Sequence, residues 1–274
     1  MGASPSLRPL SAQRHGGWYW QRGWGYGHAG AWALVPITRR ELPRAVGAFP
    51  LAFVYTGDRP VLHGVLGAEA NRSAFVDARA RWQGSYVPAY LRGYPFYLME
   101  SGVGRHVVAV DESAQALQAD AYTGEPLFDE TGRPTPGLQR VIDFLGELAR
   151  SRVQTDRACQ VLEEAGVLTE WSLRLDIGGG RVKRLAGLYR VDEPRLNALE
   201  ADALQRLRDT GALGLAYAQL LSVDQRRRLE ALVKARAREQ HLPEAEAVFG
   251  EPDLEQQIDW DQLDFDDENA APGD

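Results

Sequence analysis

The pattern of apolar residues changes near Gly137, and this change limits the possible folds more than any other feature of the chain. Before it, short runs rich in β-branched and aromatic residues alternate with Gly, Asp and Pro, which is typical of antiparallel strands joined by turns. After it, apolar residues between Leu138 and Leu148 recur at the i, i+3, i+4 and i+7 spacing of an amphipathic helix. We therefore predict an α+β fold, with a mainly antiparallel β N-terminal half and a helical C-terminal half that contains a β-hairpin.

The N-terminal half contains candidate strands and two candidate short helices. Thr38 and Glu41 have the spacing of a capping box, which predicts a short helix that ends at Ala48. A second helical segment, 87–94, has to end before Pro95 because proline cannot continue a helix and restrains the residue before it. The expected strands are 33–37, 50–55, 61–66, 74–77, 96–100 and 106–110, of which the last two form a hairpin.

The C-terminal half is predicted to be helical except for one hairpin. Thr135 and Pro136 suit the cap and first turn of the first helix, and a second helical stretch stops near Gly166. The hairpin pairs 171–176 with 181–191 across three consecutive glycines, which adopt positive φ without strain. Further helices are expected at 199–207, 213–221 and 229–238.

Composition divides the chain into three parts. We expect an irregular segment rich in aromatic residues and glycine over 1–32, a single α+β domain over 33–245 and a flexible acidic tail over 246–274. Residues 251–274 hold ten carboxylates and no Lys or Arg, so residues 1–250, with 31 basic and 28 acidic side chains, are close to neutral. A near-neutral body argues against nucleic-acid binding, which needs clustered cations to displace counterions from phosphates.

The acidic tail also carries large apolar side chains. This pattern is typical of disordered segments that fold onto a partner, and equally of segments that only keep a chain soluble. Both interpretations stay open, and docking of a partner is one of them. The apolar residues concerned are Ile258, Trp260, Leu263 and Phe265.

The segment 15–32 combines six glycines with six aromatic side chains and has neither helical nor strand periodicity. Trp18, Trp20 and Trp24 are its candidate binding residues. Exposed aromatic surface is costly in water, so this segment either packs across the body of the protein or contacts a ligand.

The sequence contains no recognisable catalytic, metal or nucleotide motif. Five scattered histidines lack the spacing of a zinc or iron site, and Gly178–Gly180 lacks the Lys and Ser or Thr of a phosphate loop. We therefore predict no metal and no cofactor. His106, in an apolar strand, is predicted to be a hydrogen-bonded core or edge residue, and Cys159, beside Val161 and Leu162, a buried inert thiol.

The lone cysteine fits a reducing compartment, and the first ten residues lack the apolar region of a secretory signal. No apolar stretch approaches the roughly 20 residues that span a bilayer. We therefore expect a cytoplasmic protein that does not insert into a membrane.

Arginine and tyrosine are concentrated in the segment 81–98, RWQGSYVPAYLRGYPFYL. A planar guanidinium forms paired hydrogen bonds and stacks on rings, so such a cluster recognises carboxylates, aromatic rings or peptide backbones. The same tyrosines would equally serve to pack a junction between strand and helix. The candidate binding residues here are Arg81, Trp82, Tyr86, Tyr90, Arg92 and Tyr94, with Tyr97 beside them.

Seven blocks of sequence, in the same order and spread over residues 10–238, resemble the bacterial SapC family. They are Val35-Pro36 with Glu41-Leu42-Pro43-Arg44; Phe49-Pro50 with Phe53-Val54; Trp82 with Tyr86 to Arg92 and Tyr94-Pro95-Phe96; Gly124 to Asp129; Thr135-Pro136; Val191-Asp192-Glu193 before Leu196; and Gly211-Ala212-Leu213. The family takes its name from a surface-layer gene region, and its members are often encoded near TonB-dependent receptors and flavin-dependent halogenase-like proteins. The resemblance thus implies an accessory role, and it supplies no catalytic residues.

Three hypotheses about function follow. The first is a non-catalytic accessory protein that recognises a peptide or protein in a surface-layer or envelope-related pathway. The second is an enzyme, or partner of an enzyme, of unrecognised type that acts on a peptide or small molecule and draws its acid and base groups from one set of residues. The third hypothesis is a structural subunit of a surface layer, which would need an export route, and no export signal is evident. In the enzyme hypothesis, the candidate acid and base groups are Arg92, Tyr94, His106, Asp111 and Glu125.

Overall fold

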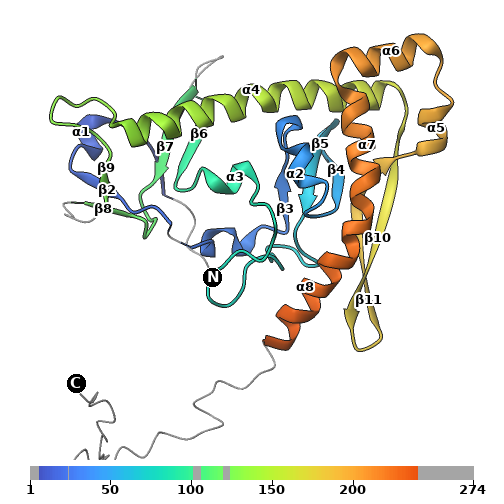
Figure 1. Ribbon diagram of the computed structural model, residues 1–274, viewed down its shortest axis with the longest axis horizontal. Helices are drawn as coiled ribbons and strands as arrows, with labels where there is room; N and C mark the ends of the chain where they lie inside the picture. Colours follow the sequence, from blue (N-terminus) through green and yellow to red (C-terminus); the bar gives the residue numbers. More distant parts are fainter. Residues whose placement is uncertain (1–5, 24, 101–105, 120–123, 240–274) are drawn as a thin grey trace, which may run out of the picture. The chain divides into compact units, whose positions relative to one another are not determined.

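The computed structural model describes residues 6–23, 25–100, 106–119 and 124–239 (Figure 1). The chain divides into two units, Met1–Ala237 and Arg238–Asp274, and the described residues belong almost entirely to the first. Trp24 and the acidic tail with its apolar residues lie outside the described residues.

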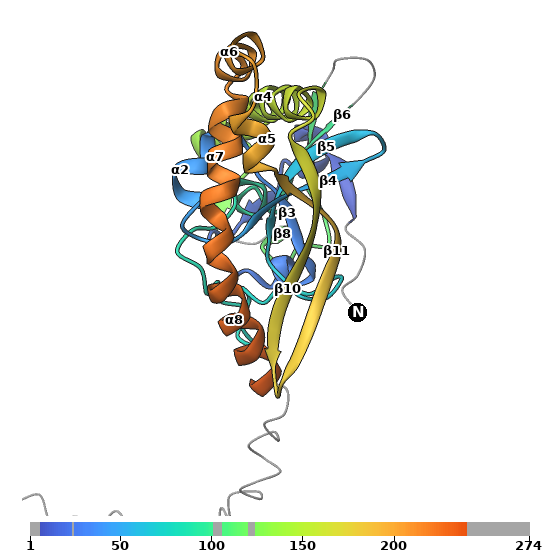
Figure 2. The ribbon, with the colours of Figure 1, turned by 90° about the vertical axis from the view of Figure 1, so that its right-hand side faces the viewer.

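The largest sheet is antiparallel and contains five strands in the order β10-β11-β4-β5-β3. Its strands come from both halves of the sequence, since Tyr189 of β11 pairs with Phe53 of β4. Figure 2 shows β10 and β11 as a long twisted ribbon beside α7 (Ala212–Ser222) and α8 (Arg226–Glu239). The strands are β3 (Leu34–Pro36), β4 (Leu51–Thr56), β5 (Arg59–Val65), β10 (Leu168–Gly178) and β11 (Arg181–Val191).

Two smaller antiparallel sheets lie near the N-terminal end of the long helix α4 (Pro136–Glu164), whereas the five-stranded sheet lies near its C-terminal end (Figure 1). The first has the order β1-β7-β6 and contains the predicted hairpin, while the second has the order β8-β2-β9. Their strands are β1 (Leu7–Pro9), β6 (Phe96–Glu100), β7 (His106–Asp111), β2 (Trp18–Trp20), β8 (Leu117–Ala119) and β9 (Glu125–Pro126).

Helices connect and cover these sheets. The first helix after the β-rich half was predicted as two stretches, but it is the single helix α4, Pro136–Glu164, 29 residues long. Thr135 caps it by accepting a hydrogen bond from the Leu138 amide at 3.4 Å. The other helices are α1 (Ala12–His15), η1 (Gly27–Ala31), η2 (Arg39–Glu41), α2 (Leu42–Ala45), α3 (Ala89–Arg92), α5 (Glu193–Asn197), α6 (Ala201–Thr210), α7 (Ala212–Ser222), η3 (Val223–Gln225) and α8 (Arg226–Glu239).

Two hydrophobic clusters form the core, and α4 contributes to both. Leu138 and Leu145, near its start, belong to the smaller cluster beneath the β1-β7-β6 sheet. Cys159 and Leu162, near its end, belong to the larger cluster beneath the five-stranded sheet. Because apolar burial is the main favourable term in folding, α4 joins the two parts of the molecule energetically.

The α+β prediction is confirmed, and two local predictions are wrong. The expected strand 74–77 is a turn in which only Val76 forms a bridge, with Trp82. The Asp77 side chain bonds the amides of Arg79 and Arg81 and so closes this turn instead of leaving an extended strand. The helix expected to reach Ala48 already ends at Ala45.

The N-terminal segment packs on both clusters through short elements. Trp18 and Trp20, on β2, contact the smaller cluster, and Tyr26 and Trp32 contact the larger one. For these four side chains the structure supports the packing interpretation of the aromatic segment.

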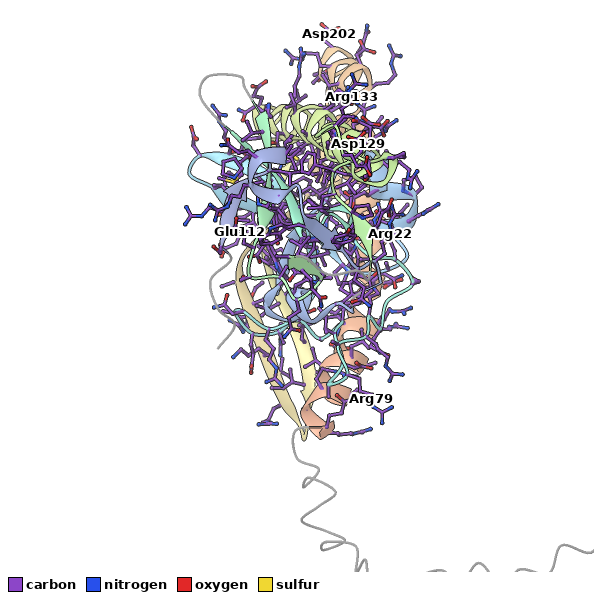
Figure 3. The ribbon with its side chains drawn as sticks, turned by 90° about the vertical axis from the view of Figure 1, so that its left-hand side faces the viewer. Arg22, Arg79, Glu112, Asp129, Arg133 and Asp202 are labelled. Atoms are coloured by element: carbon purple, nitrogen blue, oxygen red, sulfur yellow. The ribbon has the colours of Figure 1, made fainter. Side chains whose placement is uncertain are left out.

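Helix α1 is held to the β1-β7-β6 sheet by a polar contact that the sequence pattern did not indicate. His15 is completely buried, and its Nε2 lies 3.2 Å from Glu112 Oε1. Arg14 also bonds Glu112, and these two hydrogen bonds, that to Arg14 foremost, lower the pKa of Glu112 to about 2. Figure 3 shows Glu112 on one margin of the molecule and Arg22 on the other.

Candidate binding site

The short helix α3 is held in place by a buried carboxylate from a distant part of the chain. Glu41 is 5% exposed, and its Oε1 accepts hydrogen bonds from the Ala89 amide at 2.7 Å and the Tyr86 hydroxyl at 2.9 Å. Its Oε2 accepts from the amide of Thr38 at 2.8 Å, so the predicted capping box is present. One carboxylate therefore organises both η2 and α3, and burial together with Glu41 raises the pKa of Tyr86.

Three pockets surround α3, and the first, which we call the arginine pocket, has a volume of 350 Å³. The Arg92 guanidinium lies 5.7 Å from the centre of the Tyr86 ring and 5.2 Å from that of Phe144, so aromatic faces hold it in place. Arg40 pairs with Glu147 at 2.9 Å. The residues that line this pocket include Arg40, Arg44, Tyr86, Arg92, Phe144 and Ser151.

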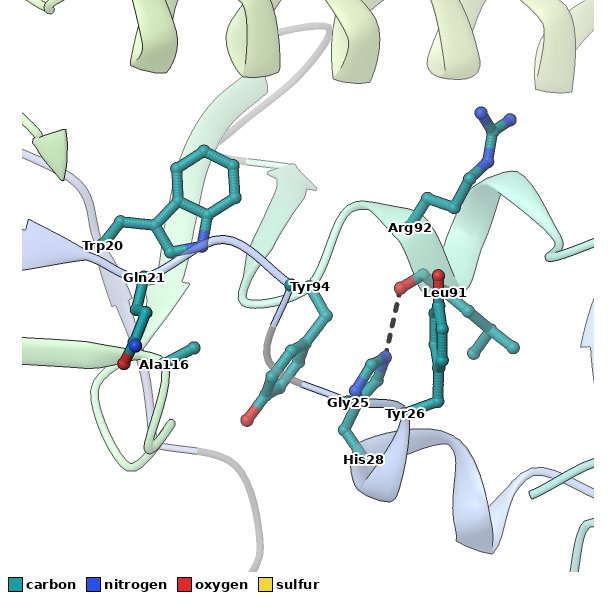
Figure 4. Close-up of a pocket in the computed structure, with 10 residues that line it drawn as sticks. Trp20, Gln21, Gly25, Tyr26, His28, Leu91, Arg92, Tyr94 and Ala116 are labelled. Atoms are coloured by element: carbon teal, nitrogen blue, oxygen red, sulfur yellow. Dashed lines mark hydrogen bonds between the residues drawn. The ribbon is translucent and has the colours of Figure 1, made fainter. Parts of the chain in front are cut away.

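The second, the aromatic pocket, has a volume of 170 Å³ and shares Arg92 with the first (Figure 4). His28 stacks on Tyr94, with 3.9 Å between ring centres and an angle of 4°. Its Nε2 donates to the Leu91 carbonyl at 3.1 Å, because a carbonyl oxygen only accepts. Burial lowers the pKa of His28 despite this bond. Trp20 forms part of the wall.

The third, the β6 groove, has a volume of 370 Å³ and is lined mainly by apolar side chains. Four consecutive residues of β6, Phe96 to Met99, line it together with Tyr90, Leu148 and the exposed His106. Successive side chains of a strand point to opposite faces, so a groove that touches four in a row follows the edge of the strand.

Three predicted binding residues lie outside these pockets. Trp82 stacks on Phe75 at 5.3 Å and donates to the Tyr86 carbonyl. Arg81 pairs with Asp77 at 2.8 Å, and Trp18 packs edge-on against a buried histidine. Of the predicted set, the arginine pocket contains Tyr86 and Arg92, the aromatic pocket contains Arg92, Tyr94 and Trp20, and the β6 groove contains Tyr90.

The five residues of the enzyme hypothesis do not share one of these pockets. Arg92 and Tyr94 line the aromatic pocket, and His106 lines the β6 groove. The Asp111 carboxylate accepts hydrogen bonds from the Ser6 amide at 2.9 Å and from the Ser113 hydroxyl. Glu125 forms an ion pair with Arg22 at 2.7 Å. The geometry therefore gives this set no common reaction centre.

The described residues include no group of three or more His, Cys, Asp or Glu side chains arranged to hold a metal ion. In the same part of the chain, no helix is both long and apolar enough to cross a membrane. Cys159 is buried as expected, and burial raises the pKa of its thiol to about 12.

The site also contains four residues that the sequence did not mark as binding residues, namely Glu41, Arg44, His28 and Ser151. Glu41 and Arg44 belong to a block that carries the family resemblance, and Glu41 also has the capping-box spacing with Thr38. His28 and Ser151 enter the site only through tertiary contacts.

Fold and pockets define an α+β protein whose candidate binding surfaces surround one short helix. A comparison with known families matches residues 10–229 to SapC, and the chain belongs to the SapC family. Neither the comparison with curated proteins nor that with solved structures gives a match.

Proposed function

We propose that the protein is a non-catalytic accessory protein that recognises an extended peptide segment of a partner, in a surface-layer or envelope-related pathway. The observation that carries this proposal is the open edge of β6 beside an apolar groove. The family resemblance supports the accessory role and the pathway.

The pairing of β6 with β7 defines which backbone groups point outward. Asp111 donates its amide to the Pro95 carbonyl, so alternate residues of β6, starting at Tyr97, bond to β7. Val108 lies opposite Leu98, but its carbonyl points away from β6 and accepts a hydrogen bond from the Leu10 amide. The amide and carbonyl of Leu98 therefore point to the open edge, where no described residue bonds them.

An extended peptide is the partner that such an edge and groove fit. Strand addition satisfies the outward backbone groups, and the groove receives alternate side chains of the added strand. Because Leu148 and the β6 side chains are apolar, we expect apolar residues at those alternate positions.

Selection of a random displayed peptide library on the full chain, followed by titration of a synthetic winner, tests the proposal. Leu98→Pro removes the outward amide, which an edge strand tolerates at such a position, and we expect about tenfold weaker binding. Leu98→Ala retains that amide and serves as the matched control for the lost side chain.

N-methylation of the peptide at successive positions provides an independent readout. Only every second methyl group should weaken binding, since alternate amides of an added strand face β6. No saturable peptide, or binding that ignores both Leu98→Pro and N-methylation, contradicts the proposal.

A further inference from the structure

The arginine pocket contains positive charge without a partner. Arg40 is neutralised by Glu147, and Glu41 is occupied by four hydrogen bonds. Arg44 forms no hydrogen bond or ion pair with any described residue. Among the same residues, the Arg92 guanidinium pairs with no carboxylate; it contacts the hydroxyl and ring of Tyr86 and the ring of Phe144. Two guanidinium groups therefore remain available to an anion.

The same pocket contains a buried hydroxyl without a partner. Ser151 of α4 is 2% exposed, and its Oγ has no hydrogen-bond partner within the described structure. One turn later, Thr155 Oγ1 accepts from the Arg39 amide and donates to the Ser151 carbonyl. Leaving a buried hydroxyl unpaired costs about 1–3 kcal/mol, so a polar group that reaches Ser151 Oγ from the pocket would gain a hydrogen bond that the protein itself does not provide.

The walls also suit an apolar group. Phe144, Leu148 and Pro43 line the pocket together with Arg92, whose guanidinium is held against two rings. A guanidinium fixed by stacking still offers its N–H edge for paired hydrogen bonds to a carboxylate.

We propose that the arginine pocket binds an organic carboxylate, with Arg92 and Arg44 holding the carboxylate, Ser151 hydrogen bonding to it, and the apolar wall receiving the attached body. A monoanion fits better than a dianionic phosphate, because the pocket also contains the carboxylates of Glu41 and Glu147. The ligand is either a free acid or the carboxyl group of a peptide. The inference does not depend on the edge of β6.

Calorimetric titration of the full chain tests this site with phenylacetate as the probe, phenylacetamide as its neutral match, and inorganic phosphate. We expect saturable binding of phenylacetate and at least tenfold weaker binding of the other two. A short peptide ending in phenylalanine, with its carboxyl group free or amidated, distinguishes the source. Tighter binding of the free-carboxyl peptide than of phenylacetate assigns the site to peptide ends, and the reverse order assigns it to small acids.

Substitutions locate the binding. Arg44→Gln, at an exposed position without a partner among the described residues, and Arg92→Lys should each weaken phenylacetate binding about tenfold, and Ser151→Ala several-fold. Arg150→Gln removes a neighbouring exposed charge of α4 outside the pocket and should leave binding unchanged. Absence of phenylacetate binding, equal binding of phosphate, or binding insensitive to both Arg44→Gln and Ser151→Ala overturns the proposal. If such binding is still weakened by Arg92→Lys, the probe lies in the aromatic pocket, which shares Arg92.

Discussion

The aromatic pocket and the arginine pocket share Arg92 but differ in how their polar groups are satisfied. In the aromatic pocket, His28 has both a carbonyl partner and a stacked ring. In the arginine pocket, Arg44 and the hydroxyl of Ser151 have no partner among the described residues. Both pockets help to hold α3 in place, through His28 in the first and Glu41 in the second, but only the second also contains polar groups without a partner among the described residues. Aromatic residues therefore do not distinguish the two pockets, whereas the unsatisfied polar groups do.

The largest effect is expected at Glu41, the satisfied part of the arginine pocket. Glu41→Ala leaves the amides of Thr38 and Ala89 and the Tyr86 hydroxyl without their acceptor, so the free energy of unfolding should fall by about 3–5 kcal/mol. Chemical denaturation measures this, with the exposed Glu147→Ala as the matched control, for which less than about 1 kcal/mol is expected. Similar losses in both variants would contradict the role of Glu41 as organiser of α3.

The next effect concerns the aromatic pocket. His28→Leu removes the stack on Tyr94 and the bond to the Leu91 carbonyl, and stability should fall by about 2 kcal/mol in thermal or chemical unfolding. The exposed His106→Leu provides the control and should change stability little. If the two variants are equally stable, the contacts of His28 in the aromatic pocket do not stabilise the fold.

The structural role of His28 should also be visible in the pH dependence of stability. Because burial lowers the pKa of His28, the unfolded chain binds a proton more readily, and the contribution of His28 is complete above its unfolded value of 6.5. It is lost as the pH falls through the lower pKa of the folded state. Between about pH 7 and 5 the wild-type protein should therefore lose more unfolding free energy than His28→Leu. Burial also lowers the pKa of His63, which is present in both proteins, so their difference isolates His28. Equal slopes would contradict the prediction.

The smallest effect is expected at Ser151, and its sign is opposite. In the absence of a ligand, Ser151→Ala removes an unpaired buried hydroxyl, so stability should rise by up to about 1 kcal/mol. Thr155→Ala, one turn further along α4, should lower stability because Thr155 bonds the Arg39 amide. A loss of stability in Ser151→Ala would mean that the hydroxyl already has a partner.

Sequence patterns predicted the parts of this architecture that depend on neighbouring residues. The capping box of Thr38 and Glu41, the short α3 before Pro95 and the β6–β7 hairpin all follow from local spacing. Alternation and helical periodicity report local backbone geometry, so these elements were accessible without a structure.

The candidate site could be predicted from the sequence only in part, because its contacts join residues that are distant in sequence. Glu41 bonds the amide of Ala89, which is 48 positions away in sequence. Ser151 lines the same pocket as residues of α2 and η2 only because α4 passes over them. Conversely, Arg81 and Arg92 occur in one block of similar composition, yet one closes a turn with Asp77 and the other lines two pockets. Local composition does not determine which way each side chain points.

The length of α4 has a consequence for the dynamics of the chain. At about 1.5 Å per residue, the helix extends roughly 43 Å and is anchored in one cluster by Leu138 and in the other by Leu162. Breaking either cluster removes the support of half the helix, so sub-global opening of one region should weaken the other. Amide protons in the middle of α4 should therefore exchange with solvent only as fast as the whole molecule unfolds, and the two clusters should melt in a single cooperative transition.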